Sequence, residues 1–271
     1  MLGNRKKCRS GALVLAATLG CTSPSWGADW SDTYIGYRYG NDFAEPYVGE
    51  GIQKHIVNLG HSSGYKYGTN FFNLDLLESD RKNTNAQEAY VVYRHTLDFG
   101  KILGKNLAIG PARGFGFTLG FDWNTKTGDS YQSRKRMWVF GPTVMLDVPG
   151  FLNVGLFMLR ESNHPVAVQA AGRSRYSYDS HWMLNLAWGI PVGGSGFSFE
   201  GYLNWIGAKG KNEFGGKTSA EFNIDTMVMY DLSRHVGAKP KTFRLGLEYQ
   251  YWRNKCGNPK EANGSLARTP M

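Results

Sequence analysis

The sequence lacks the long apolar run that a membrane-spanning helix needs. Beyond its first 27 residues no stretch approaches the roughly 20 consecutive apolar residues of such a helix, and the mean hydropathy is −0.40. Cysteine is scarce as well, with 3 in 271 residues. Cys8 and Cys21 lie near the N-terminus, so Cys256 is the one cysteine that follows, which excludes a disulfide framework and a cysteine-rich zinc site. A membrane protein of this composition must span the bilayer as a closed β-barrel.

The sequence also lacks the motifs of familiar enzyme classes. The six histidines contain no His-Glu-x-x-His pair, and Gly114-x-Gly116 has no third glycine at the spacing of a dinucleotide fingerprint. His61-Ser62-Ser63 resembles the His-x-Ser of outer-membrane lipid hydrolases, in which the histidine is the base for a serine nucleophile. We interpret that tripeptide as a polar turn, with the lipid hydrolase as an alternative. We expect no catalysis, no cofactor and no metal.

The first residues follow the layout of a secretory signal. A basic cluster precedes the apolar run Gly11 to Leu19, and Ser25 and Gly27 place small residues before a cut ahead of Ala28. The basic residues are Arg5, Lys6, Lys7 and Arg9. This predicts a signal peptide over 1–27 and a mature domain over 28–271. A short buried helix would leave the basic cluster unexplained, and a lipid anchor at Cys21 fits only a partial lipobox.

Positive charge is concentrated in the predicted loops. Without its first 27 residues the chain carries 27 Lys and Arg against 22 Asp and Glu. Nucleic acid is one partner for a basic surface, but an exported chain rarely meets it, so we expect simple solubility or contact with anionic outer-membrane lipids and lipopolysaccharide. The loop residues concerned are Lys126, Arg134, Lys135, Arg136, Arg173, Arg175, Lys209, Lys211 and Lys217.

The stretch from Gly114 to Asp122 shows the pattern on which the fold prediction depends. Phe115, Phe117, Leu119 and Phe121 fall on one side of an extended chain, because strand side chains alternate with period 2. Glycine, threonine and aspartate fall on the other side. Large apolar residues outside and small or polar residues inside are typical of a lipid-facing barrel strand.

This alternation recurs along the chain and predicts an antiparallel transmembrane β-barrel of about 12 strands. Long and short connections alternate, although 99–112 is too long for this rule. A soluble sandwich, the alternative, would carry charge on its outward rows. The tail Cys256 to Met271 does not show the pattern of a strand. Since eleven strands are predicted and bacterial barrels have an even number, either the last strand is absent from this chain or one strand is not recognised in the sequence. The predicted strands are Thr33 to Tyr39, Ile52 to Leu59, Lys66 to Leu77, Glu88 to Leu97, Gly114 to Asp122, Arg136 to Val148, Phe151 to Glu161, His181 to Ile190, Phe197 to Ile206, Ala220 to Leu232 and Phe243 to Trp252.

Six sequence blocks, spread over most of the mature chain, resemble the Tsx-like nucleoside-specific channels of the Gram-negative outer membrane. They are Tyr37-Arg-Tyr-Gly40, Tyr67-Gly-Thr-Asn-Phe-Phe-Asn-Leu-Asp75, Glu88-Ala-Tyr-Val-Val-Tyr93, Glu161-Ser-Asn-His164, Gly201-Tyr-Leu-Asn-Trp205 and Glu248-Tyr-Gln-Tyr-Trp-Arg253. The resemblance implies a monomeric twelve-stranded barrel with a narrow pore for passive nucleoside uptake. It also implies a role for some relatives as phage or colicin receptors, and a closing strand with a C-terminal aromatic, which Met271 does not provide.

A pore for nucleosides should combine aromatic surfaces with hydrogen-bonding groups, because a nucleoside has an aromatic base, several hydroxyls and no phosphate. The inward rows supply both kinds of group. The alternative is that the charged residues only brace the wall, or that the lumen of a surface receptor is blocked. The candidate pore-lining residues are Arg38, Phe43, Phe71, Asp75, Glu88, Tyr90, Arg94, Glu200, Tyr202, Asp225, Arg244, Glu248 and Trp252.

Overall fold

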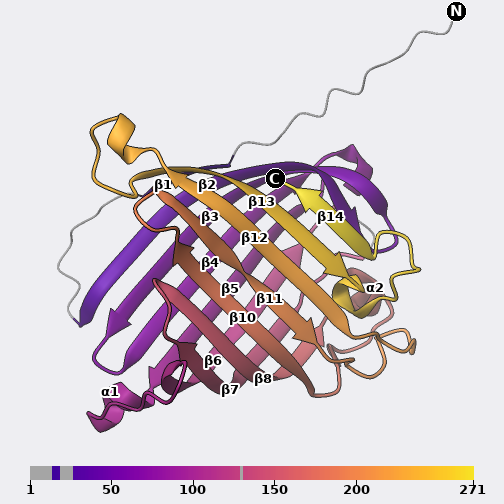
Figure 1. Cartoon of the computed structure of the whole chain (residues 1–271). Helices are drawn as coiled ribbons and strands as arrows, with labels where there is room; N and C mark the ends of the chain where they lie inside the picture. The colour runs from indigo at the N-terminus through magenta and orange to yellow at the C-terminus, as the bar shows by residue number, and fades with distance from the viewer. Residues whose placement is uncertain (1–13, 19–26, 129–130) are drawn as a thin grey trace, which may run out of the picture.

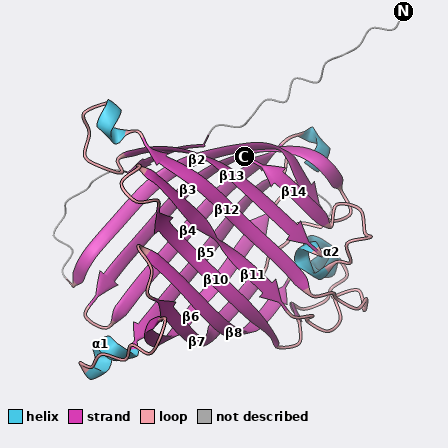
Figure 2. Cartoon of the chain, in the orientation of Figure 1, coloured by secondary structure: helices cyan, strands magenta, loops and turns pink. Residues whose placement is uncertain are grey.

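The protein folds into a nearly closed antiparallel β-barrel (Figures 1 and 2). A computed structural model describes residues 14–18, 27–128 and 131–271, and for 14–18 it gives the backbone alone. Neighbouring strands in the sequence pair with each other around the wall, except that the two-residue strand β9 pairs only with β8. The predicted all-β barrel is therefore confirmed.

All eleven predicted strands are present within the described residues, and several are longer than predicted. The observed ladders continue through polar residues near the loops, where alternation of hydrophobicity gives no signal. These strands are β2 Ala28–Glu45, β3 Gly49–Tyr65, β4 Gly68–Ser79, β5 Gln87–Asp98, β6 Ala112–Lys126, β7 Arg136–Leu146, β8 Phe151–Asn163, β10 His181–Pro191, β11 Phe197–Ile206, β12 Glu221–Asp231 and β13 Phe243–Arg253.

The two faces of the strands follow the predicted alternation. On β6, Leu119 is 46% exposed on the outer face, whereas Thr118 and Asp122 are buried on the inner face. The inward glycines of β6 are required by close backbone approach: a Cβ on Gly116 would lie 2.3 Å from the carbonyl oxygen of Leu97. Glycine therefore lets the wall bend tightly at this point.

The connections separate the barrel into two ends, which we call the turn end and the loop end. Most turn-end connections are short, such as 66–67 and 147–150, but 99–111 contains the helix α1 Phe99–Leu103. Helices α1 and α2 Val166–Ala170 lie at opposite ends of the barrel (Figure 1). The loop end also carries η1 Arg81–Asn83, β9 Tyr176–Ser177 and η3 Lys255–Gly257, and η2 Ser233–His235 lies at the turn end. No helix in the described ranges is long and apolar enough to cross a membrane.

The tail of the chain contains a strand, which corrects the prediction that Cys256 to Met271 has none. Strand β14 Leu266–Pro270 pairs with β13 from Arg253 to Tyr249. The backbone of Met271 adds two hydrogen bonds with Glu248, of 2.8 and 3.0 Å. The strand has only five residues, one of them proline, so its local sequence gives no alternation to detect.

A second short strand fills the rest of the gap between β13 and β2, which we call the seam. Strand β1 Val14–Thr18 pairs with β13 from Phe243 to Gly246 and with β2 from Tyr34 to Tyr37. Strand β14 thus occupies the loop-end half of the seam and β1 the turn-end half. Apart from β1 and Gly27, the predicted signal peptide lies outside the described residues, and its cleavage stays a prediction.

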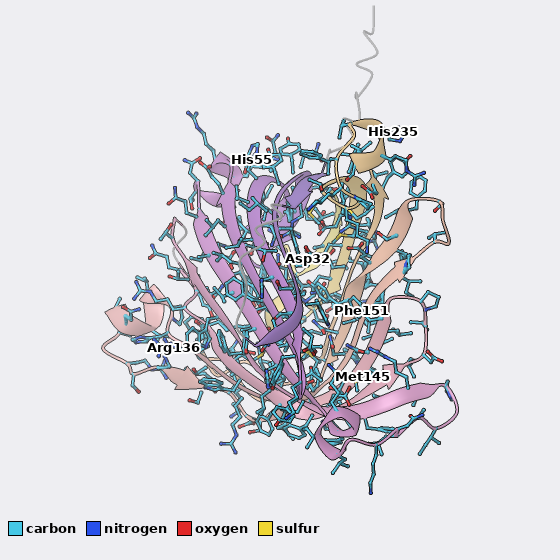
Figure 3. All side chains as sticks on the ribbon, turned by 90° about the vertical axis from the view of Figure 1, so that its left-hand side faces the viewer. Asp32, His55, Arg136, Met145, Phe151 and His235 are labelled. Carbon is cyan, nitrogen blue, oxygen red and sulfur yellow. The ribbon has the colours of Figure 1, made fainter. Side chains whose placement is uncertain are left out.

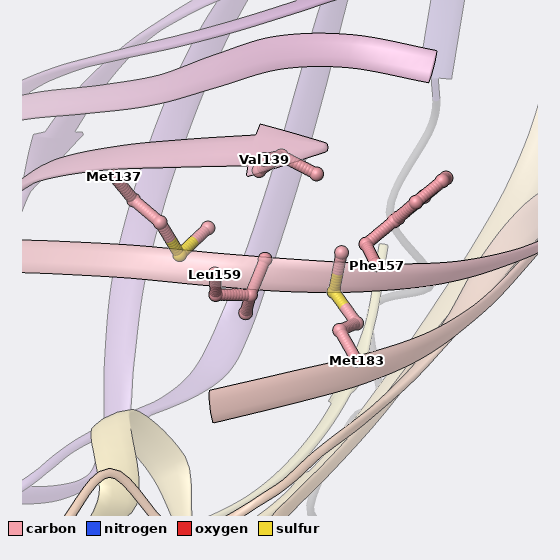
Figure 4. Packing of buried hydrophobic residues seen from close by; sticks show 5 residues of the cluster. All are labelled: Met137, Val139, Phe157, Leu159 and Met183. Atoms are coloured by element: carbon pink, nitrogen blue, oxygen red, sulfur yellow. The ribbon is translucent and has the colours of Figure 1, made fainter. Parts of the chain in front are cut away.

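Part of the inner face is apolar, which differs from the polar interior that the sequence pattern predicts. Met137, Val139, Phe157, Leu159 and Met183 form a buried cluster on the inner side of β7, β8 and β10 (Figure 4). These strands carry apolar residues on both faces, so alternation assigns the faces without identifying this cluster. Figure 3 shows that side chains extend from both sides of the wall.

Candidate functional site

The predicted pore-lining residues all lie on the inner side of the wall, but they form separate groups. Arg38, Asp75, Asp225 and Glu248 come together near the seam. The other groups are centred on Arg94, on Arg244 and on Trp252. Phe43 packs apart from them, in a second inner apolar cluster with Ile52, Ile56 and Met271.

Arg38 connects strands on both sides of the seam. Its Nη2 lies 2.6 Å from Asp75 Oδ1 on β4, and its Nη1 lies 2.9 Å from Glu248 Oε1 on β13. Asn58, on β3 between them, donates from Nδ2 to Asp75 Oδ1 at 2.7 Å. Asn58 was not among the candidate residues, because the stretch 52–59 alternates poorly and does not indicate which side chains face inward. Arg38 therefore links β2 to β4 and to β13, an arrangement that supports the bracing alternative, and we call this residue with its acids the brace.

Three buried acceptor atoms beside this brace receive no hydrogen from a donor of the described chain, and the carboxyl groups of Asp225 and Glu248 lie within hydrogen-bond distance of each other. They are Asn223 Oδ1, Asp225 Oδ1 and Glu248 Oε2, which we call the acceptor group. Tyr202 is next to it, since Asn223 Nδ2 lies 3.5 Å from the Tyr202 hydroxyl, and Tyr202 is 36% exposed inside the wall. Buried polar atoms are rarely left unpaired, so this group is suited to accept hydrogen bonds from water or a ligand.

The wall formed by β5 and β6 carries a second group. Arg94 Nη1 donates to Asp122 Oδ1, and the Tyr90 hydroxyl donates to Asp122 Oδ2 at 3.3 Å. Phe71 pairs across strands with Arg94 and is 39% exposed. Arg94 thus pairs with an acid outside the candidate residues, and the candidate Glu88 accepts from Asn124 at 2.7 Å. Asp122 was visible in the inward row of β6 and was left out of the candidates.

Two smaller groups lie toward the ends of the barrel. Arg244 is paired with Glu200 and donates to Ser198 Oγ at 2.9 Å, so β13 and β11 are connected across β12. Trp252 donates from Nε1 to Glu221 Oε2 at 3.2 Å. Each candidate charge in these groups has a structural partner, which supports a bracing role for Arg244 and Glu200.

Two buried carboxylates at the loop end of the interior, Glu45 and Glu161, are each paired with lysine side chains. Glu45 pairs with Lys54, with Lys126 at 3.6 Å and with Lys255 at 3.3 Å. Lys126 is only 8% exposed, so its predicted place in a lipid- or solvent-facing loop is wrong. The sequence held the signal that was missed, because Lys126 continues the inward row of Thr118 and Asp122.

Lys209 was also predicted to face lipid or solvent and is instead buried, with 4% exposure. Its Nζ lies 2.9 Å from Glu161 Oε1 and 3.7 Å from Glu221 Oε1. His181 also lies beside this carboxylate, with its Nε2 3.9 Å from Glu161 Oε2. Lys209 follows β11 within a glycine- and lysine-rich loop, so no periodicity predicted where its side chain points.

The loops at this end are tied together through Glu213. Its carboxylate accepts hydrogen bonds from the hydroxyls of Tyr131 and Tyr178, the latter at 2.8 Å, and Arg173 donates to its backbone oxygen at 3.2 Å. Burial, together with Glu213, raises the pKa of Tyr131 well above its usual range. Burial, with Tyr131 next, raises the pKa of Tyr178 in the same direction. Both phenols therefore stay protonated and keep donating over a wide pH range.

His61, Ser62 and Ser63 lie within β3, so their predicted place in a polar turn is wrong. The two residues of the lipid-hydrolase alternative have separate partners. His61 Nδ1 lies 2.7 Å from Thr33 Oγ1, whereas Ser63 Oγ lies 3.4 Å from Asn70 Nδ2. Among the described side chains, no group of three or more His, Cys, Asp or Glu is placed to hold a metal ion.

No family model matches this chain, and no curated protein matches it. The Tsx-like resemblance therefore stays a prediction from the sequence blocks. The structure shows the barrel itself.

Proposed function

We propose that this protein is an outer-membrane channel for the passive uptake of nucleosides or similar small polar aromatic molecules. The observation that carries the proposal is the acceptor group beside Tyr202, inside a barrel whose outer face is apolar. The proposal needs a membrane location and a basis for selectivity, and each has its own support.

The membrane location is supported by exposed apolar rows flanked by aromatic residues. Leu156 and Leu247 are exposed in the middle of the outer face, where a soluble protein would place charge. Exposed aromatic residues gather toward both ends, as in the girdles of outer-membrane barrels. Those toward the loop end are Trp123, Trp138, Trp182 and Trp205, and those toward the turn end are Trp30, Phe151, Phe197 and Phe243. The short connections would then face the periplasm.

The selectivity is supported by the chemistry of the interior. An aromatic base would stack on Tyr202 or Phe71, both of which remain accessible inside the wall, and such stacking stabilises by about 1–3 kcal/mol per base. The hydroxyls of a ribose would donate to the acceptor group. Because Asp225 and Glu248 are carboxyl groups, an anionic phosphate would be disfavoured, so the proposed solute is a nucleoside rather than a nucleotide.

Liposome swelling tests this function directly. Vesicles containing the protein should swell faster in thymidine than in a sugar of matched size, and Tyr202→Ala should remove most of that difference. Tyr249→Ala, which removes an aromatic side chain from the outer face, is the matched control and should preserve it. Equal swelling rates for the two solutes would overturn nucleoside selectivity.

A receptor barrel with a blocked lumen is a second candidate, favoured by the hydrogen bonds that join three loops over one end through Glu213. Phage or bacteriocin would be its partner. Absence of any conductance in a planar bilayer, together with particle binding to cells that express the protein, would favour it over the channel.

A further inference from the structure

Four arginines gather on the outer face of the barrel near the loop end. Arg134, Arg136 and Arg160 are exposed and Arg175 is half-buried, and we call these four residues the arginine patch. In the strand register, Arg136 lies opposite Ser162 and Arg160 lies opposite Trp138. Arg175 Nη1 donates to the backbone oxygen of Arg134 at 2.8 Å, so the loops before β7 and after β8 are joined next to Arg136. Figure 3 places Arg136 at the periphery of the molecule.

The arginine patch has no acidic partner in the part of the chain that the structure describes. No carboxylate of residues 27–128 or 131–271 lies within 4.0 Å of its guanidinium groups, whereas the interior arginines Arg38, Arg94 and Arg244 are all paired. Burial, followed by the positive charges of Arg136 and Arg134, lowers the pKa of Arg175. Like charges held together without an acid are unfavourable, and an external anion would relieve that repulsion.

An aromatic surface continues directly from the patch along the strands. Arg136 pairs across strands with Trp123, and Trp138 pairs with Phe121. Trp123 stacks on Phe121 with ring centroids 4.4 Å apart, and its ring meets that of Trp138 edge to face at 6.1 Å. A ligand covering both areas needs an anionic group at one end and apolar chains at the other. Headgroup phosphates lie at this depth, next to the aromatic girdle of a barrel.

We propose that the arginine patch binds the phosphate group of an acylated, phosphorylated membrane lipid whose acyl chains lie along Phe121 and Trp138. Planar guanidinium groups bind phosphate through paired hydrogen bonds, which a single ammonium group does not provide. A free phosphate ion would use the arginines but leave the aromatic surface uncovered. The inference rests on the proposed membrane location and is independent of what passes through the lumen.

The test measures lipid binding to the full-length protein in detergent micelles by native mass spectrometry. The probe is lipid A carrying two phosphates, compared with the same lipid after removal of both phosphates. Arg136→Gln combined with Arg160→Gln should weaken binding of the phosphorylated probe by about tenfold or more, and added salt should weaken wild-type binding. Arg81→Gln combined with Lys105→Gln removes the same charge from exposed sites elsewhere and should leave binding within about twofold of wild type.

Three outcomes would overturn the proposal. The first is unchanged binding in the Arg136 and Arg160 double variant. The second is equal binding of the two probes, which would assign the lipid to the aromatic girdle alone. The third is full competition by inorganic phosphate, which would indicate a site for a free anion. If the double variant does not fold, Arg134→Gln with Arg175→Gln tests the same site from the loops. A channel that loses this lipid but keeps thymidine selectivity would separate this proposal from the channel proposal.

Discussion

Two walls of the same interior differ in chemistry and in how they are held. The charged wall, formed by β2, β4, β12 and β13, contains Arg38 and its acids, and the apolar wall, formed by β7, β8 and β10, contains the cluster around Leu159. Strands β8 and β10 pair without interruption over nine residues. The charged wall includes the seam, where two short strands replace one long one. The ion pairs Arg38–Glu248 and Lys255–Glu45 connect the two sides of the seam through side chains.

Removing the central charge of the charged wall should have the largest effect. Arg38→Met would leave Asp75 and Glu248 buried without their counter-ion, and breaking such a pair typically lowers the free energy of unfolding by about 3–5 kcal/mol. Denaturant titration in micelles measures this change, and planar bilayers should show a shift toward cation selectivity. Arg81→Gln, at an exposed site, serves as the control. A loss no larger than that of the control would mean that Arg38 does not brace the seam.

The apolar wall should respond through packing alone. Leu159 is fully buried, so Leu159→Ala leaves a cavity and should lower the free energy of unfolding by about 2–4 kcal/mol. Ion selectivity should stay at the wild-type value, which distinguishes this wall from the charged one. Leu156→Ala, on the outer face of the same strand, should have a smaller effect. A change in selectivity with Leu159→Ala would contradict the division into two walls.

The smallest effect is expected at Cys256, in η3 at the loop end. Its side chain is exposed, so Cys256→Ser removes no packing contact of the interior. The same denaturant titration should show a change in the free energy of unfolding of less than about 0.5 kcal/mol. A loss as large as that of Leu159→Ala would show that the loops at this end are packed around the thiol.

The sequence predicted the features that depend on neighbouring residues of one strand, such as which side chains face outward. It did not predict the contacts that form only when the barrel closes. Alternation placed Phe115 and Leu119 outside and Asp122 inside, and the loop pattern distinguished the two ends. Arginine–acid pairing was expected in general, but the specific contact of Arg38 with Glu248 spans 210 residues and exists only when the wall has curved round. Strand β14 was missed for the same reason, since five residues become a strand here only because β13 offers an edge.

The seam also has a consequence for the order of assembly. Every other joint in the wall connects strands that are close in sequence and can pair as soon as both are made. The joint between β2 and β13 must wait until segments more than 200 residues apart meet, and contacts of such separation form slowly because a long loop has to close first. The strands should therefore pair first as an open, curved sheet, and the contact between Arg38 and Glu248 should form last, when the barrel closes.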